Sequence, residues 1–300
     1  MILFDHYQVE HLELRNKYFF KQQLFLNNMH KILEKKELAE NIFLIKVEAE
    51  AIAKKAKPGH FIILRINETG ERIPLTIADH DKKTITLVVQ AIGKTTKDLS
   101  KLKVGNEIQD IVGPLGNPSK INKVGTVCLV AGGVGCAEIY PIAKEFKKQG
   151  NKVIIIFGAR NKSLLFWEEE FKKISDELII CTNDGSKGIE GFVTQPLEKL
   201  IKENNLDLIM AVGPLPMMKA VTELTKNKVK TLVSLNSIMI DGTGMCGGCR
   251  ITIKGKPKFV CVDGPEFNAE DIDFEEIMKR NSTYKKEEEH ICKLGGYDKG

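Results

Sequence analysis

The sequence predicts a protein of the α/β plus β class: a small antiparallel β-barrel, a parallel-sheet α/β domain and a small C-terminal lobe. Three observations lead to this order. Short alternating strands occupy residues 29–122, strands alternate with helices over residues 123–232, and residues 233–300 are rich in glycine and cysteine. A chain of 300 residues is long enough for two domains or three small ones.

The predicted barrel rests on the polarity of its strands. Residues 41–49 (NIFLIKVEA) and 84–92 (TITLVVQAI) alternate in polarity, and residues 57–66 (KPGHFIILRI) contain a Pro-Gly turn followed by an apolar run. Short strands at this spacing are typical of a small antiparallel barrel. The alternation begins only after Met29, so we expect residues 1–28 to be an N-terminal extension of unknown role.

The second part shows a different periodicity. Apolar strands are predicted at 126–133, 152–160, 177–186 and 206–216, and helices at 137–149, 163–174, 193–204 and 217–227. Strands that alternate with helices predict βαβ units, and therefore a parallel sheet that is buried on both faces. The third part, from residue 233, is expected to hold little regular structure.

Composition and charge exclude several classes of function. Apolar residues make up 42% of the chain, which is enough for real cores. The net charge of +5 comes from lysines spread among glutamates, so we expect no nucleic-acid partner. No apolar run reaches about 18 residues and the N-terminus lacks the apolar centre of a signal peptide, so no membrane partner is expected. Crowded cysteines in these surroundings predict metal ligation in a reducing cytoplasm.

Each predicted strand of the α/β domain ends in a turn that contains glycine. These turns hold Gly132, Gly133 and Gly135, then Gly158, then Asp184 and Gly185, and finally Gly213 and Pro214. Glycine lets a backbone approach a phosphate, and the following helix start supplies N–H donors and positive dipole. A single such turn is equally compatible with tight packing, but four turns along one sheet edge favour a nucleotide site.

The predicted barrel carries a second candidate site. Thr76 ends one strand, and Gly93, Lys94, Thr95 and Thr96 follow another. Their hydroxyl, ammonium and backbone N–H groups could bind a flavin and its pyrophosphate. Polar residues at hairpin ends are also ordinary, so the residues alone leave both interpretations open.

Three cysteines and an aspartate form the sharpest motif of the chain. Asp241, Cys246, Cys249 and Cys261 follow the pattern Asp-x4-Cys-x2-Cys-x11-Cys. The plant-type [2Fe–2S] spacing is Cys-x4-Cys-x2-Cys, so Asp241 stands in place of the first thiolate. A zinc ribbon is the alternative, although zinc ribbons usually present two Cys-x2-Cys knuckles and this chain has one.

The order of the motifs resembles a known family. The motifs are RIPLT (72–76), GKTT (93–96), GPLGNP (113–118), AGGVG (131–135), TNDGS (182–186), GFVT (191–194), VGPLPMM (212–218) and MCGGC (245–249). They are similar to those of the FAD/NAD-binding electron-transfer subunits of the dihydroorotate dehydrogenase type, in the ferredoxin–NADP reductase superfamily. Those subunits carry four cluster cysteines. The Asp-plus-three-Cys form resembles the small (alpha) subunits of NADH-dependent reduced ferredoxin:NADP+ oxidoreductases, which bifurcate electrons.

This resemblance implies the domains and the cofactors. Residues 29–122 would bind FAD, residues 123–232 NAD(H), and residues 233–300 a [2Fe–2S] cluster. The implied FAD contacts are Arg72, Pro74, Leu75, Thr76, Gly93, Lys94 and Thr95. The implied NAD(H) contacts are Gly132, Gly133, Gly135, Asp184, Gly185, Gly213 and Pro214, and the implied cluster ligands are Asp241, Cys246, Cys249 and Cys261.

The resemblance also implies a function and a partner. The chain would be an oxidoreductase subunit that passes electrons between NAD(H), FAD and the cluster to a larger subunit carrying FAD and [4Fe–4S] clusters, with ferredoxin reacting through the complex. The alternatives are the equivalent subunit of a dihydroorotate or sulfide dehydrogenase, and a zinc-ribbon interaction protein.

The chain departs from the superfamily pattern at three points. The flavin motif is Arg-x-aromatic-Ser/Thr, but Ile73 stands at the arginine position, with Arg72 one residue earlier, and Leu75 replaces the aromatic residue. Cys136 follows the nucleotide glycines where Ala-Pro is common, and we interpret it as a small residue at a helix start. Arg160 could favour a 2′-phosphate, but the resemblance favours NAD(H).

Overall fold

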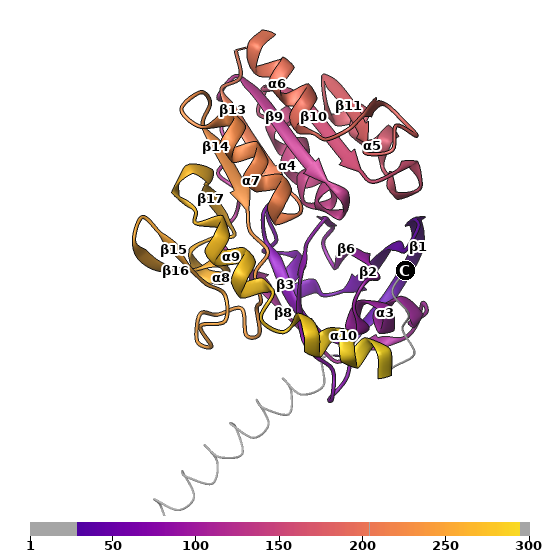
Figure 1. The fold of residues 1–300 in the computed structure, drawn as a ribbon. Helices are drawn as coiled ribbons and strands as arrows, with labels where there is room; N and C mark the ends of the chain where they lie inside the picture. The colour runs from indigo at the N-terminus through magenta and orange to yellow at the C-terminus, as the bar shows by residue number, and fades with distance from the viewer. Residues whose placement is uncertain (1–28, 204, 295–300) are drawn as a thin grey trace, which may run out of the picture.

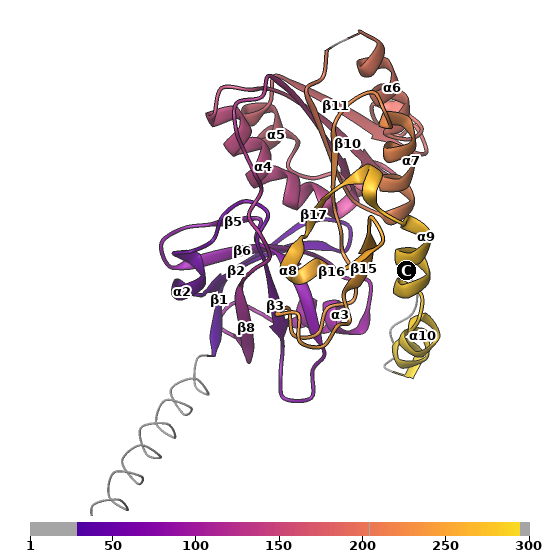
Figure 2. The same ribbon diagram turned by 90° about the vertical axis from the view of Figure 1, so that its left-hand side faces the viewer.

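The computed structural model describes residues 29–203 and 205–294 (Figure 1). A lower part built from antiparallel strands carries an upper part in which helices flank a parallel sheet, and the C-terminal segments lie beside both (Figures 1 and 2). The predicted N-terminal extension, residues 1–28, lies outside the described residues. Within the described part of the chain, no helix is long and apolar enough to cross a membrane.

The lower part contains eight strands in two antiparallel sheets. The first sheet has the order β5-β6-β2-β1-β7 and the second has the order β4-β3-β8. The strands are β1 (His30–Ala39), β2 (Ile42–Glu48), β3 (Phe61–Arg65), β4 (Arg72–Thr76), β5 (Asp79–His80), β6 (Thr84–Gln90), β7 (Glu107–Ile108) and β8 (Asp110–Leu115). Two helices, α2 (Glu50–Ala53) and α3 (Lys94–Lys101), join them.

The predicted antiparallel barrel is confirmed as two barrel-like antiparallel sheets, but the barrel is not closed, because no continuous ladder joins the two sheets in the described part of the chain. The chain passes from one sheet to the other after β4: the Ile77 N–H donates to the carbonyl oxygen of His60, directly before β3, and the Ala78 N–H donates to the carbonyl oxygen of Thr86 in β6. Apolar side chains from both sheets form one core, including Ile45 and Leu64. The alternation of the strands therefore predicted the buried faces, but it did not predict that the strands divide into two sheets.

The upper part is the predicted parallel sheet, with seven strands in the order β12-β11-β10-β9-β13-β14-β17. Its strands are β9 (Thr126–Gly132), β10 (Lys152–Ala159), β11 (Glu177–Thr182), β12 (Ile189–Glu190), β13 (Leu208–Val212), β14 (Thr231–Ser234) and β17 (Glu266–Asn268). Its helices are α4 (Cys136–Lys148), α5 (Glu168–Ile174), α6 (Thr194–Glu203) and α7 (Leu215–Thr225), with short 3-10 turns η1 (Gly133–Gly135) and η2 (Lys162–Leu164). Helices α4 and α5 cover one face and α6 and α7 the other (Figure 2).

One predicted helix of this part is shorter than expected. The prediction covered residues 163–174, but α5 begins only at Glu168. Trp167 precedes it with φ of 58°, a left-handed conformation that ends the preceding turn. The rings of Phe166 and Trp167 contact each other at 5.5 Å between centroids, and Trp167 also contacts Tyr140 at 5.0 Å. Aromatic packing against α4 therefore overrides the helical period of the segment.

The C-terminal part holds more regular structure than the sequence predicted. It contains a hairpin of β15 (Arg250–Ile253) and β16 (Lys256–Phe259), then α8 (Val260–Asp263), η3 (Ala269–Asp271), α9 (Phe274–Asn281) and α10 (Lys285–Leu294). Strand β17 pairs antiparallel with β14 and so extends the large sheet. The segment is thus joined to the α/β domain through a strand, and its extent as a separate lobe stays a prediction.

Candidate functional site

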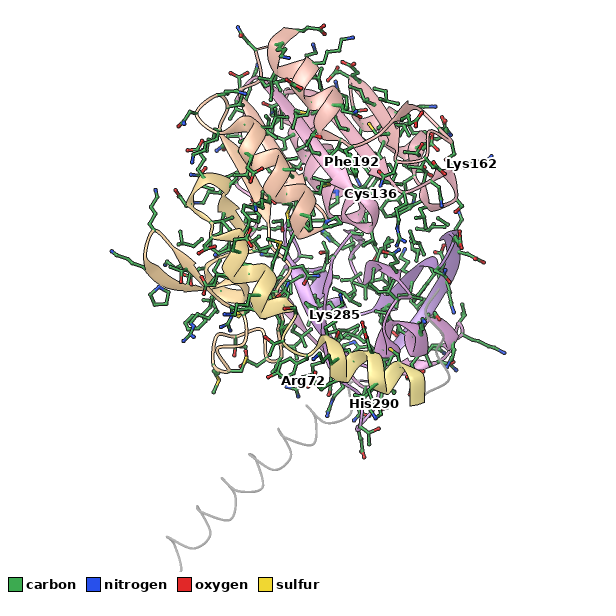
Figure 3. The ribbon with its side chains drawn as sticks, in the orientation of Figure 1. Arg72, Cys136, Lys162, Phe192, Lys285 and His290 are labelled. Atoms are coloured by element: carbon green, nitrogen blue, oxygen red, sulfur yellow. The ribbon has the colours of Figure 1, made fainter. Side chains whose placement is uncertain are left out.

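A cavity of about 780 Å³ lies between the two sheet systems. Its walls are mainly apolar side chains and glycine backbone, contributed by β4 on one side and by the ends of β9, β10 and β13 on the other. In Figure 3, Cys136 and Phe192 lie at the edge of the parallel sheet that faces the lower part. Cavities of this size and lining are the usual binding sites for small molecules and cofactors.

The topology of the parallel sheet explains why the cavity forms there. From β9 the chain proceeds outward to β10 and β11, and it later returns to β13 on the opposite side of β9. The connections leave the sheet in opposite directions at this point, which opens a crevice at the carboxyl ends of the strands. The predicted glycine turns after β9 and β13 lie on either side of this crevice, and Gly158 at the end of β10 also lines the cavity.

The glycines of these turns have two different roles. A Cβ atom on Gly135 would lie 2.5 Å from the Val212 carbonyl oxygen, and one on Gly132 would lie 2.5 Å from the Met217 sulfur. Gly135 is therefore required for close packing of backbone between the two turns, whereas at Gly132 the flexible Met217 side chain could move away. Gly133 is different: its φ is 54° and a Cβ atom there would meet no described atom within 4 Å. Gly133 is thus the glycine whose backbone is open for a ligand to approach.

On the opposite wall, the structure places part of the predicted flavin motif in the cavity. Pro74, Leu75 and Thr76 all line it, at the end of β4. Arg72 opens the same strand, paired with Arg65, and does not line the cavity. The side chain of Arg72 lies low in Figure 3, in the lower part and away from the parallel sheet.

The other predicted flavin contacts lie beside Arg72. Gly93, Lys94 and Thr95 form the start of α3, outside the cavity lining. The Thr95 hydroxyl donates to Glu71 at 2.8 Å, which places the start of this helix next to Arg72. The structure therefore separates the predicted flavin residues into a ring-side set, Pro74 to Thr76, and a second set around the start of α3.

The predicted nicotinamide contacts divide in a similar way. Gly213 and Pro214 line the cavity, but Asp184 and Gly185 do not. The Asp184 carboxylate accepts hydrogen bonds from the backbone N–H and the hydroxyl of Ser186, at 3.0 and 2.6 Å, so it stabilises its own turn. Its neighbour Asn183 lines the cavity instead.

Two further residues border the cavity on this side. Arg160 follows β10, as expected from its position in the sequence. Phe192 is 66% exposed although it lines the cavity, so its ring stands at the entrance (Figure 3). The sequence analysis did not select Phe192, although an aromatic residue directly after a glycine in the motif GFVT was a usable signal.

The most informative residue that the sequence analysis missed is Glu138, in the first turn of α4. It lines the cavity, and its Oε2 atom accepts a hydrogen bond from the Thr76 hydroxyl at 3.3 Å. Burial, opposed by the nearby Ser234 and Thr76 hydroxyl groups and reinforced by nearby Glu266, raises the pKa of Glu138 to about 7. A charged residue within an otherwise apolar helix start was the signal that could have found it.

The cysteine motif lies in a loop and a short helix beside the lower part. Cys249 and Cys261 are buried, with their sulfur atoms 3.2 Å apart, while Cys246 is exposed. The Asp241 carboxylate accepts the backbone N–H of Thr243 at 2.7 Å and that of Cys246 at 2.6 Å. Over residues 29–203 and 205–294, no group of three or more His, Cys, Asp or Glu side chains lies close enough together to hold a metal ion.

The chemistry of these donors fits an iron–sulfur cluster. The Gly248 N–H donates to the Cys246 sulfur, and the Cys261 N–H donates to the Cys249 sulfur, each at 3.4 Å. Such N–H···S bonds stabilise thiolates and tune cluster potentials. Burial and the neighbouring Cys249 sulfur raise the pKa of Cys261 to about 12, so a bound metal would have to displace its proton.

The cysteine loop packs directly on the sheet that carries the flavin motif. A Cβ atom on Gly242 would meet the side chains of Leu115 and Ile63 at 2.5 and 2.9 Å. Ile63 of β3 is paired in register with Pro74 of β4. A single strand, β3, therefore separates the loop from the motif RIPLT in this sheet.

Cys136 is confirmed as a packing residue at the start of α4. Its side chain is fully buried, and burial raises the pKa of its thiol well above the ordinary value. A thiol that is neither exposed nor ionised reacts poorly with oxidants.

Family models match two parts of the chain. Residues 129–223 match the oxidoreductase NAD-binding domain, and residues 236–273 match the iron–sulfur cluster binding domain of dihydroorotate dehydrogenase B. The two matches coincide with the glycine turns and with the cysteine motif. They bear out the NAD(H) and iron–sulfur cofactors that the sequence analysis predicted.

Similar proteins extend these matches over most of the chain. A Thermotoga maritima protein named dihydroorotate dehydrogenase B (NAD(+)), electron transfer subunit homolog, is 48% identical over 87% of this chain and 93% of its own length. The electron transfer subunit from Fusobacterium nucleatum is 36% identical over 81% of this chain and 96% of its own length.

Solved structures also support this relationship. A chain from the structure of NADH-dependent reduced ferredoxin-NADP oxidoreductase, solved for insight into flavin-based electron bifurcation, has a TM-score of 0.85 and 46% identity, covering 91% of this chain and 99% of that chain. The Amycolatopsis cytochrome P450 reductase GcoB, at 20% identity and a TM-score of 0.59 over 68% of each chain, shares the fold. The predicted resemblance is thus confirmed, and the chain belongs to the family of dihydroorotate dehydrogenase B electron transfer subunits and their homologues.

Proposed function

We propose that the chain is the electron-transfer flavoprotein subunit of an NADH-dependent ferredoxin:NADP oxidoreductase. It takes electrons from NADH through FAD and passes them by way of a [2Fe–2S] cluster to a larger partner subunit. Support comes from the likeness to the bifurcating enzyme over 91% of the chain, together with Asp241 in place of a fourth cysteine.

One observation carries this proposal: the cavity and the cysteine loop adjoin the same small sheet. Pro74, in β4, lines the cavity, and Ile63, its partner in β3, contacts the turn at Gly242 in the cysteine loop. A flavin in the cavity and a cluster in the loop would therefore be separated by little more than one strand. Such a short path suits electron transfer between two centres.

Each cofactor has a set of residues in this proposal. Pro74, Leu75 and Thr76 bind the flavin ring, and the residues around the start of α3, with Arg72, bind its phosphates. Gly133 and the turn at Gly213 and Pro214 receive NAD(H), while Asp184 and Gly185 shape the turn beside it. Asp241, Cys246, Cys249 and Cys261 hold the cluster. When bound, FAD links a two-electron hydride donor to a one-electron carrier.

The chain's own residues orient the ligands and exclude water. Leu75 and Pro74 supply an apolar wall, and the close packing of Gly132 and Gly135 against the β13 turn keeps the two walls of the crevice in place. Burial of Cys249 and Cys261 shields one side of the cluster loop, while the exposed Cys246 faces outward.

The surface beside the cysteine loop supports a partner subunit. Ile240, Met245 and Val262 are exposed by 52%, 88% and 47%, and they flank the cluster motif. Several exposed apolar side chains near one functional loop are typical of a protein interaction site. We propose that the larger subunit, with its own FAD and [4Fe–4S] clusters, covers this surface, and that ferredoxin reacts through the complex in the cytoplasm.

The proposal is tested on protein purified without oxygen, by visible absorption and EPR spectra with iron, zinc and flavin assayed on one sample. We expect flavin bands and a reducible [2Fe–2S] signal at about two irons per chain. Zinc without flavin would contradict the proposal and would favour a zinc-ribbon interaction protein.

A second function is supported by the matches to dihydroorotate dehydrogenase B. In that case the partner would oxidise dihydroorotate. The protein that co-purifies with the tagged chain distinguishes the two functions. A subunit that reduces NADP+ supports the first, and a dihydroorotate-oxidising subunit supports the second.

A further inference from the structure

The carboxyl group of Glu138 lies in the cavity wall and is only half satisfied. Its Oε2 atom accepts the hydrogen bond from Thr76 at 3.3 Å. Its Oε1 atom is shielded from solvent and has no hydrogen-bond partner in the part of the chain that the structure describes. Because a buried polar atom without a partner is costly, this oxygen calls for a ligand.

Helix capping does not explain this placement. An acidic side chain in the first turn of a helix usually accepts a free N–H of that turn or faces solvent. No side-chain cap is present at the start of α4. The Glu138 carboxyl instead reaches β4 of the other sheet system, across the cavity edge.

The surroundings of Glu138 favour a neutral acid. The groups that act on it are Thr76 from β4, Ser234 from the end of β14 and Glu266 from β17, and none of them is a cation. Glu266 is half-buried, lies opposite Ser234 in register, and accepts a hydrogen bond from Ser119. An ionised Glu138 would therefore face a second carboxyl group without a counter-ion.

We propose that Glu138 positions the redox ligand of the cavity as a neutral carboxylic acid, whose Oε1 hydroxyl donates a hydrogen bond to a carbonyl oxygen of the bound ring system. This inference rests on the proposed function, because the flavin ring and the nicotinamide carboxamide both carry such a carbonyl. Thr76 fixes the orientation of the acid by binding its other oxygen.

This arrangement makes binding depend on pH. The Oε1 hydroxyl is a donor only while the acid is protonated, and above its pKa of about 7 a carboxylate would face a carbonyl oxygen. Glutamine at this position keeps a neutral donor at every pH. Alanine removes the donor altogether.

The test titrates the full-length, flavin-free chain separately with FAD and with NADH by calorimetry, at about pH 6 and about pH 9, on either side of that pKa. For one of the two ligands we expect wild-type affinity to fall about tenfold at the higher pH. Glu138→Gln should bind that ligand equally well at both pH values, and Glu138→Ala should bind it weakly at both. Glu145→Gln, on the same helix, serves as the matched control and should behave like wild type.

The ligand whose binding responds identifies the ring that Glu138 contacts. The same pH dependence in wild type and Glu138→Gln would overturn the inference. Tight binding of both ligands that is unchanged in every Glu138 variant would also overturn the inference. The proposed function would still stand in that case. Failure of wild type to bind either ligand at either pH would overturn both.

Infrared spectroscopy of the wild-type chain provides a second measurement if a variant does not fold. We expect a buried carboxylic acid C=O band that decreases as the pH is raised from about 6 to about 9. A wild-type spectrum that shows only carboxylate across this range would contradict the proposal.

Discussion

The interdomain cavity and the cysteine loop are built in opposite ways. The cavity is framed by the ends of regular strands, and its glycines allow backbone to pack against backbone, as at Gly135 and Val212. The loop has no regular structure between β14 and β15, and its shape depends on N–H groups that bind Asp241 and on a buried pair of sulfur atoms. We therefore expect the cavity to keep its shape without a ligand, and the loop to reach its final geometry only when a metal binds.

Cys249→Ser should separate these two regions most clearly. Removing one thiolate of the buried pair should reduce the iron content from about two per chain to near none. NADH affinity should stay within about twofold, because Cys249 does not line the cavity, although Leu235, Asn236 and Met239 of the same loop do. Iron analysis and calorimetry measure both effects. Cys292→Ser, in α10, is the matched control, and wild-type iron content in Cys249→Ser would contradict the ligand assignment.

Glu138→Gln should change the pH dependence of stability. The pKa of Glu138 is raised from 4.5 to about 7 in the folded state, so the unfolded chain ionises first. Its contribution is fully present below about pH 4.5 and is lost as the pH rises through about 7. The variant should lack this loss, which amounts to about 3 kcal/mol. Urea unfolding between about pH 5 and about pH 8 measures the difference, and parallel curves for both proteins would contradict it.

Gly135→Ala should damage the cavity without affecting the cluster. The new Cβ atom would lie 2.5 Å from the Val212 carbonyl oxygen, so the turns after β9 and β13 must separate. We expect a loss of about 1–3 kcal/mol in stability and at least about tenfold weaker NADH binding, with iron content unchanged. Gly93→Ala is the folding control, because no described atom lies within 4 Å of its Cβ position. Unchanged NADH affinity in Gly135→Ala would show that the turn does not bind the nucleotide.

Asp241→Cys should produce the smallest structural effect. A carboxylate keeps the negative charge of a thiolate but is a harder and less covalent donor, so the variant should retain its cluster and shift its potential. EPR-monitored redox titration measures the shift. If the potential does not move, Asp241 is a structural acceptor for the N–H groups of Thr243 and Cys246 and is not a ligand.

Much of the fold and part of the site followed from local patterns in the sequence. The parallel sheet, its glycine turns and the cysteine motif each depend on residues within a few positions of one another, so periodicity and spacing were sufficient to predict them. The same local reasoning failed at residues 163–167, where ring contacts between Trp167 and Tyr140 replaced a helical turn. It also overlooked β17, which extends the sheet by pairing with β14.

The sequence by itself determined which residues are chemically able to bind a nucleotide, a flavin and a cluster. Only the tertiary structure decided which of them face one cavity, excluding Asp184 and Arg72 from its lining and adding Glu138. The orientation and the pKa of the Glu138 carboxyl group depend on Thr76, 62 residues away, and on Glu266 of β17. The charge state of a buried acid depends on the solvent it has lost and on the groups that surround it, and folding alone brings those groups together.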